Sequence, residues 1–328
     1  MKVAVFEVHD YEDDDFALAP SYGLEIQTCR EILSRKNLSL VQGCKGVSVL
    51  GHSILDAQIL TELKKAGVRF IATRTIGYNH IDMKAAQALK LRVSNAQYSP
   101  HNVADFTVML MLMLLRKAKI PVIRALVNDF SLDDMRGKEL RSCTVGIVGA
   151  GKIGRAVMQN LSGFGCKILV YDPFAENIAL PEGAKQASLD EILTTCDILS
   201  LHIPFTEDNR HFLDGGRLNK MKRGALLINT ARGELVDTEA LICAVESGQI
   251  GGVAIDTVED EENICHVDLG TRVVPKRDLF YLKQFPNVIY TPHLAFFTEE
   301  ATSAMVQSAL ESLKLFDENR PNPYEIIP

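Results

Sequence analysis

Three polar features of this 328-residue chain each follow a short apolar run with the character of a β-strand. They are Arg232, an acidic stretch at 259–262 and His293. An arginine can hold a carboxylate through two parallel hydrogen bonds, and a histidine can give or take a proton near neutral pH. If the strands are parallel neighbours, their carboxyl ends meet at one edge of a sheet. The three features then suit a small 2-hydroxy acid, which carries a carboxylate beside a hydroxyl group.

Each of these features alone also has an ordinary structural interpretation. Arg232 could form a surface ion pair, the acidic stretch could be a solvated loop, and His293 could simply satisfy backbone groups at a strand end. The functional interpretation therefore depends on all three meeting at one sheet edge.

A glycine-rich turn lies between two further apolar runs in the segment 144–172, TVGIVGAGKIGRAVMQNLSGFGCKILVYD. The run at 145–148 predicts a buried strand, and the residues after the turn predict a helix. Two of the glycines let the backbone approach a pyrophosphate, and the third lets the helix pack closely on the sheet. The predicted dinucleotide-binding turn consists of Gly149, Ala150, Gly151, Lys152, Ile153 and Gly154.

An acid closes the second apolar run of this segment. Asp172 lies 21 residues after Gly151, where a carboxylate can accept hydrogen bonds from both ribose hydroxyls and repel a 2′-phosphate. Glycine turns occur in many proteins, but here the strand, the helix and the acid stand in the order that dinucleotide binding requires. We therefore predict NAD as the cofactor.

Apolar runs alternate with helical patterns along the chain, which predicts parallel sheets covered on both faces. Because the glycine turn comes late, we expect a separate α/β domain before it. We expect strands at 3–8, 46–50, 70–73, 145–148, 168–171, 198–202, 225–229, 252–256 and 288–291, and helices at 27–34, 56–66, 83–89, 103–119 and 238–247.

Composition and charge argue against several classes of protein. With 35 Lys and Arg residues against 42 Asp and Glu residues, the chain has a formal net charge of −7 and no basic cluster, which disfavours nucleic acid or an anionic membrane as a partner. No targeting peptide is visible, and the longest apolar run, 108–115, is too short to span a bilayer. We expect a cytoplasmic protein. The helix around this run needs cover from another domain or a second subunit, and we expect a homodimer.

The seven cysteines are scattered without a Cys-x-x-Cys pair, so we predict neither a disulfide framework nor a zinc site. Cys265 followed by His266 could begin a metal site, but no second pair of ligands stands at a suitable spacing. We predict no bound metal.

Seven stretches, in order along nearly the whole chain, resemble the D-isomer-specific 2-hydroxyacid dehydrogenase family, and within it the D-lactate dehydrogenase and VanH-like group. They are ATRTIGYNHIDMKAA (72–86), YSPHNVADFTVMLML (98–112), TVGIVGAGKIGRAV (144–157), LHIPFTEDNRHF (201–212), LLINTARGELVDTEAL (226–241), GGVAIDTVEDEE (251–262) and PNVIYTPHLAFFTEEA (286–301).

The resemblance implies an α/β fold with two doubly wound parallel-sheet domains. A Rossmann-type NAD-binding domain at 100–297 would be inserted in a smaller, flavodoxin-like substrate domain at 1–99 and 298–328. The two crossings, near Pro100 and Phe297, are candidate hinges for closure of the site.

The resemblance also implies roles for individual residues. Arg232 matches the family's substrate-binding arginine, His293 its acid/base histidine, and Glu261 the carboxylate that pairs with that histidine. Beside the glycine turn and Asp172, the cofactor site would include His202, Pro204, Thr230, Ala231 and Asp256. The substrate site would include Arg74, Ile76, Gly77, Tyr98 and Phe296.

One segment departs from the family's pattern. Residues 50–53 lack the tyrosine that some lactate enzymes place over the substrate methyl group, so the pocket should have room for larger side chains. We expect an NAD-dependent D-2-hydroxyacid dehydrogenase that reduces pyruvate to D-lactate. The alternatives are a dehydrogenase of larger, branched or aromatic 2-keto acids, and an NAD(H)-sensing, corepressor-like binding protein, which a turnover assay would separate from the enzymes.

Overall fold

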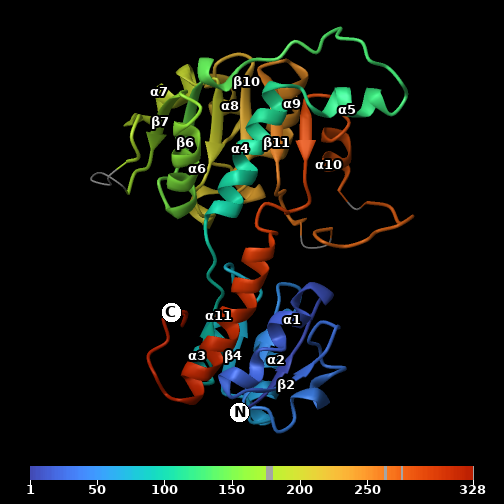
Figure 1. The fold of residues 1–328 in the computed structure, drawn as a ribbon, viewed down its shortest axis with the longest axis vertical. Helices are drawn as coiled ribbons and strands as arrows, with labels where there is room; N and C mark the ends of the chain where they lie inside the picture. Colours follow the sequence, from blue (N-terminus) through green and yellow to red (C-terminus); the bar gives the residue numbers. More distant parts are fainter. Residues whose placement is uncertain (175–179, 262–263, 275, 328) are drawn as a thin grey trace. The chain divides into compact units, whose positions relative to one another are not determined.

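The computed structural model describes residues 1–174, 180–261, 264–274 and 276–327, which form two compact units (Figure 1). The first unit comprises Met1–Ser99 and Phe297–Pro328, and the second comprises Pro100–Phe296. Phe297, which the sequence placed with the second domain, lies in the first unit.

The first unit is built on a parallel sheet with the strand order β2-β1-β3-β4-β5, the order of flavodoxin-like folds. Its strands are β1 (Lys2–Val5), β2 (Glu25–Thr28), β3 (Gly46–Val49), β4 (Phe70–Thr73) and β5 (Arg92–Ser94). Its helices are α1 (Asp13–Phe16), α2 (Ala57–Lys65), α3 (Met83–Ala88) and α11 (Glu299–Asp317). The expected helices at 56–66 and 83–89 are confirmed, and Asp56 and Asp82 cap them by accepting from backbone N–H groups.

The helix expected at 27–34 is wrong. Residues 25–28 form β2, which pairs in parallel with β1 in the register Val3↔Ile26. The backbone beyond β2 then bonds to distant segments, because Cys29 N–H donates to Val5 O and Leu33 N–H donates to Ser53 Oγ. Long-range pairing therefore replaces the local helical hydrogen bonds that the sequence favoured.

The second unit contains a parallel sheet with the strand order β12-β11-β10-β9-β6-β7-β8. The first strand of the unit, β6, stands between β7 and β9, so the strand order reverses there, as in dinucleotide-binding folds. The strands are β6 (Thr144–Val148), β7 (Lys167–Tyr171), β8 (Ala184–Gln186), β9 (Ile198–Leu201), β10 (Ala225–Asn229), β11 (Ile250–Ile255) and β12 (Val288–Tyr290). The helices are α4 (His101–Leu115), α5 (Lys119–Ala125), α6 (Lys152–Ser162), α7 (Leu189–Thr195), α8 (Gly215–Lys220), α9 (Thr238–Glu246) and α10 (Arg277–Leu282). The expected α/β class with two parallel-sheet domains is confirmed.

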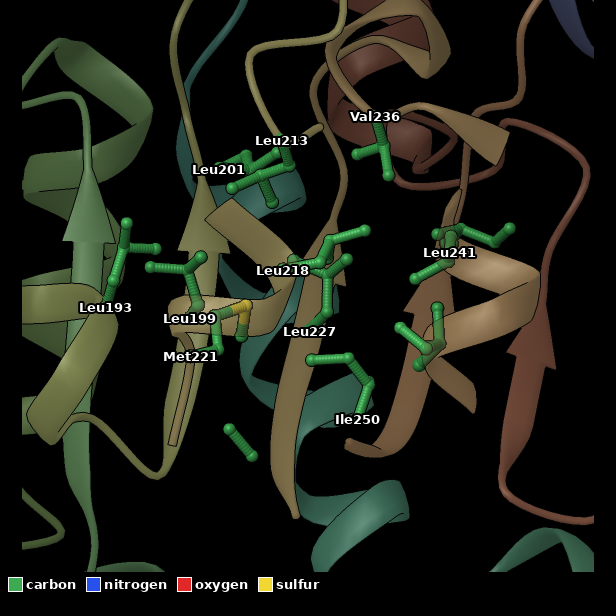
Figure 2. Packing of buried hydrophobic residues seen from close by; sticks show 14 of the residues in the cluster. Leu193, Leu199, Leu201, Leu213, Leu218, Met221, Leu227, Val236, Leu241 and Ile250 are labelled. Carbon is green, nitrogen blue, oxygen red and sulfur yellow. The ribbon is translucent and has the colours of Figure 1, made fainter. Parts of the chain in front are cut away.

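Apolar side chains fill the layer between this sheet and the helices on one of its faces (Figure 2). Leu199 and Leu227 come from the strands, and Leu218 and Leu241 come from α8 and α9. These leucines are almost wholly buried, and each stabilises the fold by about 2 kcal/mol relative to an exposed side chain. The packed layer fixes the strand ends, where the candidate functional residues stand.

The apolar helix expected at 103–119 begins earlier and ends earlier than predicted. α4 spans His101–Leu115, Lys117 adopts a left-handed backbone conformation with φ of +50°, and the separate helix α5 begins at Lys119. Leu115 O accepts from Lys138 N–H, so a distant segment caps the end of α4. In the described parts of the chain, no helix is long and apolar enough to cross a membrane.

Candidate active site

The glycine turn joins the end of β6 to the start of α6 in the second unit (Figure 1). Gly149 has φ of +104°, and a Cβ atom there would lie 2.6 Å from the carbonyl oxygen of His202. A Cβ atom on Gly154 would lie 2.0 Å from the carbonyl oxygen of Gly149. The protein's own packing therefore requires glycine at both positions.

Gly151 has a different environment, because a Cβ atom there would meet no atom of the described chain within 4 Å, apart from its neighbours in sequence. Gly151 is the N-cap of α6, and Lys152 and Ile153 begin the first turn, whose N–H groups have no partner within a helix. Open space beside these N–H groups, at the positive end of a helix, fits a pyrophosphate. The turn thus fits the phosphates of NAD.

Asp172 follows β7 and ties the glycine turn to the neighbouring strand. One carboxylate oxygen accepts from Ala150 N–H at 2.7 Å and the other from Phe174 N–H at 2.9 Å. Each oxygen keeps a second lone pair, so the carboxylate can still accept from ribose hydroxyls. This placement fits a ribose beside the phosphate-binding turn.

His202 and Pro204 follow β9, the strand next to β6 in the sheet. Burial lowers the pKa of His202 to about 4, so its imidazole is neutral at neutral pH. Its Nε2 lies 2.9 Å from Ser200 Oγ, and Pro204 O accepts from Asn209 Nδ2. A neutral, hydrogen-bonded side chain at this strand end can contact a cofactor without adding charge.

Arg232 lies on a turn after β10 that a buried asparagine shapes. Asn229, 1% exposed, accepts from Ala231 N–H and donates through Nδ2 to Arg232 O at 2.7 Å. The Arg232 guanidinium donates to Ala231 O, and none of the described carboxylates lies within ion-pair distance of it. Its remaining N–H groups are therefore available for a carboxylate ligand.

Two contacts fix this turn against the rest of the second unit. Thr230 Oγ1 lies 2.9 Å from Thr107 Oγ1 on α4. A Cβ atom on Gly233 would lie 2.0 Å from the carbonyl carbon of Val258, so the turn packs closely against the segment after β11. The close approach brings the loops that carry Arg232 and the acidic stretch into contact.

His293 and Glu261 form a close acid–base pair at this sheet edge. His293 Nδ1 lies 2.6 Å from Glu261 Oε1, and Glu261 Oε2 accepts from Val258 N–H. Both side chains are partly buried, with 28% and 17% of their surface exposed. A carboxylate on Nδ1 fixes the tautomer and leaves Nε2 to exchange a proton with a ligand.

Asp256 supports the loop that carries His293. It is fully buried at the end of β11, and its carboxylate accepts from Thr291 Oγ1 and from the N–H groups of Leu294 and Ala295. Asp256 O also accepts from His293 N–H, which holds His293 at φ of +55°. A left-handed conformation costs a non-glycine residue on the order of 1 kcal/mol, and these bonds maintain it. The structure thus gives Asp256 a positioning role that the sequence did not suggest.

The other residues of the acidic stretch have different partners. Glu259 accepts from His211 Nε2 at 2.7 Å and from Thr238 Oγ1, and Asp260 pairs with Lys276. Glu262 lies outside the described residues. Phe296, on the same unit, packs edge-on to His293 with ring centroids 6.1 Å apart.

In the first unit, the loop after β4 carries two of the expected substrate-binding residues. Ile76 O accepts from Asn95 Nδ2 and Gly77 O accepts from Thr75 Oγ1. Their N–H groups donate to no group of the described chain. Hydrogen bonds thus hold the carbonyl oxygens of Ile76 and Gly77, and the N–H groups of these two residues can bind a carboxylate. Tyr98, near the end of this part of the chain, is half-buried.

Arg74 lies elsewhere than expected. Its side chain is fully buried, and its guanidinium donates to Glu12 at 2.7 Å, to Ser48 Oγ and to the carbonyl oxygens of Phe6 and Glu7. A guanidinium with its donors committed to protein groups has none for a substrate carboxylate. The buried position of Arg74 favours a structural role at the base of the loop that carries Ile76 and Gly77.

Glu7 holds the segment 50–53, where some lactate enzymes of the family have a tyrosine. No role of this residue was predicted from the sequence. It is 3% exposed, has φ of +56°, and accepts from the N–H groups of Leu50, His52 and Ser53. Burial alone would raise the pKa of Glu7, but these hydrogen bonds and the side chains of His52 and Ser53 outweigh burial and lower it. An acid within the otherwise apolar run at 3–8 is a sequence signal that could have indicated Glu7.

Comparisons with known proteins agree with the geometry of the second unit. Residues 108–295 match the family model of the D-isomer specific 2-hydroxyacid dehydrogenase NAD-binding domain. The chain is 40% identical to a D-specific alpha-keto acid dehydrogenase of Enterococcus faecium, over 96% of this chain and 97% of the relative. It is 39% identical to an aromatic 2-oxoacid reductase of Clostridium sporogenes, over 97% and 96% of the two chains. A solved D-lactate dehydrogenase of Treponema pallidum superposes with a TM-score of 0.92 at 30% identity, over all of both chains.

The chain therefore belongs to the D-isomer specific 2-hydroxyacid dehydrogenase family. It is an NAD-dependent oxidoreductase of D-2-hydroxy acids, as the sequence predicted.

Proposed function

We propose that this dehydrogenase reduces pyruvate or a slightly larger 2-keto acid to the D-2-hydroxy acid. The observation that carries the proposal is the pairing of His293 with Glu261, beside the Arg232 turn, on neighbouring strand ends of a dinucleotide-binding sheet. Arginine and histidine at one edge offer a carboxylate grip and a proton donor, which are the two polar requirements of a 2-keto acid.

In the proposed mechanism, Arg232 binds the substrate carboxylate with two N–H groups and polarises the adjacent carbonyl. In the first unit, Ile76 and Gly77 stay predicted carboxylate-binding residues, because their N–H groups are available. His293 donates its Nε2 proton to the keto oxygen as that oxygen gains negative charge, and Glu261 stabilises the imidazolium that donates it. NADH, when bound by the glycine turn and Asp172, supplies the hydride.

Residues at the ends of β9, β10 and β11 would complete the cofactor site. They are His202, Pro204, Thr230, Ala231 and Asp256. Tyr98 in the first unit and Phe296 in the second stay predicted substrate-binding residues.

The proposed substrate range follows from residues 50–53, where Leu50, Gly51 and His52 stand in place of an aromatic lid. One relative's name refers to aromatic 2-oxoacids and a solved neighbour's to D-lactate, so both small and large substrates occur among similar proteins. Burial of one methylene group of the substrate stabilises its binding by about 0.8 kcal/mol. An apolar pocket therefore discriminates only modestly between substrates that differ by one methylene group.

The substrate proposal is tested by NADH oxidation with 2-keto acids of graded side chain. We expect 2-ketobutyrate or a branched 2-keto acid to react with kcat/KM within roughly tenfold of pyruvate. A preference for pyruvate above about a thousandfold would show that another residue closes the pocket. Absence of turnover with every 2-keto acid would instead favour the NAD(H)-sensing binding protein.

Replacement of Glu261 by glutamine should shift the pH profile of this reaction. An uncharged partner no longer favours protonated His293, so pyruvate reduction should begin to decline at a lower pH. Glu259→Gln is the matched control, because Glu259 makes the same kind of contact with His211 instead. If Glu259→Gln lowers the pH at which pyruvate reduction declines and Glu261→Gln does not, Glu261 is not the acidic residue that supports His293 in the reaction.

We also propose a cytoplasmic homodimer. In the second unit, α5 and the segment after it expose large apolar side chains, among them Leu126, Phe130 and Leu132 at 75 to 86% exposure. Monomeric proteins seldom leave so many apolar groups in water, and a second copy of the chain would cover them. None of the seven cysteines forms a disulfide, as suits a reducing compartment. Sedimentation at micromolar concentration should give twice 36.3 kDa, and a single-chain mass would contradict the dimer.

A further inference from the structure

We propose that Glu261, Cys265 and His293 form a binding site for Zn²⁺, and that the ion bound there stops turnover. The inhibition, but not the binding, rests on the proposed roles of His293 and Glu261. In the sequence, no second pair of ligands stands at a suitable spacing from Cys265, and its partners become apparent only in the fold. The fold supplies one of them, His293, from the end of another strand.

The three ligand atoms already lie close together. One atom of each side chain, the Cys265 sulfur, a Glu261 carboxylate oxygen and a His293 ring nitrogen, lies within 4.8 Å of the other two. In a tetrahedral zinc site such atoms lie about 3.5 Å apart, because the metal–ligand bonds are about 2.0 to 2.3 Å long. The side chains therefore need to move by little more than about 1 Å.

Contacts with the backbone hold all three ligand residues in this arrangement. Cys265 N–H donates to Glu261 O at 2.8 Å, which fixes the cysteine relative to the acid. Glu261 Oε2 accepts from Val258 N–H, and His293 N–H donates to Asp256 O. The three residues are only partly buried, so an ion can reach them from solvent.

The donor set selects the class of metal. Sulfur, imidazole nitrogen and carboxylate oxygen together suit Zn²⁺, whereas Mg²⁺ and Ca²⁺ prefer oxygen ligands alone. A thiolate and a carboxylate also balance the two positive charges of the ion. Three protein ligands leave one position of the tetrahedron for water.

Binding would interrupt the acid–base pair. Glu261 Oε1 now lies 2.6 Å from His293 Nδ1, and an ion shared by the two side chains takes the place of the proton between them. His293 then lacks the carboxylate that stabilises its protonated form, and the ring is fixed to the metal. Proton transfer to a keto oxygen should stop while the ion remains.

The binding site is tested first without any turnover, using Co²⁺ as a spectroscopic substitute for Zn²⁺. A cysteine thiolate bound to Co²⁺ absorbs in the near ultraviolet through charge transfer. The unmodified protein should develop this absorption, and Zn²⁺ should abolish it. Cys265→Ser and Cys265→Ala should not develop it, while Cys243→Ser, which removes an exposed cysteine on α9, should retain it. No absorption in the unmodified protein, or absorption that persists in both Cys265 variants, would overturn the proposal.

The second arm measures inhibition, with each variant compared with its own rate without metal. Loss of an outer-shell partner typically weakens metal binding 10- to 100-fold, so loss of a direct ligand should raise the half-inhibiting Zn²⁺ concentration at least about tenfold. Cys243→Ser should leave that concentration unchanged. Equal inhibition of the Cys265→Ser variant and the unmodified enzyme would show that Zn²⁺ acts elsewhere. A protein with the Co²⁺ absorption but no 2-keto acid reduction would contradict the proposed function alone, and one with reduction but no absorption would contradict this inference alone.

Discussion

Replacement of His293 by alanine should lower kcat for pyruvate reduction by about two to four powers of ten, the usual contribution of a positioned acid–base group. The variant loses the proton donor and leaves the Glu261 carboxylate without its partner at 2.6 Å. The glycine turn and Asp172 are untouched, so NADH binding, followed by fluorescence titration, should remain within a few-fold of the unmodified enzyme. Steady-state kinetics give the change in kcat.

The matched control is His211→Ala. His211 also pairs with a glutamate of the acidic stretch, at 2.7 Å, and is partly exposed like His293. Its removal tests whether the loss of any histidine–glutamate pair in this region disturbs the enzyme. We expect little change in kcat. An equal loss in both variants would mean that His293 acts through the structure and not through proton transfer.

Replacement of Arg232 by lysine should raise KM for the keto acid and lower kcat together. An ammonium group cannot reproduce the two parallel hydrogen bonds of a guanidinium, nor hold the carboxylate in the plane that polarises the neighbouring carbonyl. A combined loss in kcat/KM of at least about a hundredfold is expected from a charge-assisted pair in a partly buried site, where such bonds are worth about 1.5 to 3 kcal/mol and the orientation of the substrate is lost as well.

Arg210→Lys provides the comparison. Arg210 pairs with Glu207 three residues away at the surface, and such pairs contribute little. Its kinetics should match those of the unmodified enzyme. If Arg232→Lys raised KM without lowering kcat, Arg232 would bind the substrate equally in the ground state and the transition state and would not assist the reaction.

The parts of the fold that local sequence determines could be predicted. The strand, glycine turn and helix around Gly149–Gly154 follow from short-range requirements, since Gly149 has φ of +104° and a Cβ atom at Gly154 would lie 2.0 Å from the carbonyl oxygen of Gly149. Helices with an aspartate at the N-cap, such as α2 and α9, were expected within one or two residues of their observed bounds. Each of these features depends on residues within one turn or one strand of each other.

Features that depend on distant partners could not be predicted. Residues 27–34 bond to the segment after β1 and to Ser53 instead of forming a helix, and α4 ends where Lys138 N–H caps it. Glu7 holds the segment 50–53 by accepting from the N–H groups of Leu50 and His52, which are 43 and 45 residues away in the sequence.

The pairing of His293 with Glu261 joins residues 32 apart. It was inferred from family resemblance, and the same resemblance wrongly suggested a substrate contact for Arg74. Arg74 instead pairs with Glu12, 62 residues away, inside the first unit. Tertiary packing can thus bury a charged residue that the sequence suggests as a substrate-binding residue.

This chain uses an NAD cofactor to interconvert 2-keto acids and 2-hydroxy acids of the D hand. The most direct test is to incubate the protein with pyruvate and NADH, follow NADH oxidation by absorbance, and resolve the lactate formed on a chiral column. We predict stoichiometric D-lactate, no detectable L-lactate, and no oxidation of L-lactate in the reverse direction. Formation of L-lactate would show that hydride reaches the opposite face of the keto acid and would exclude a D-specific dehydrogenase.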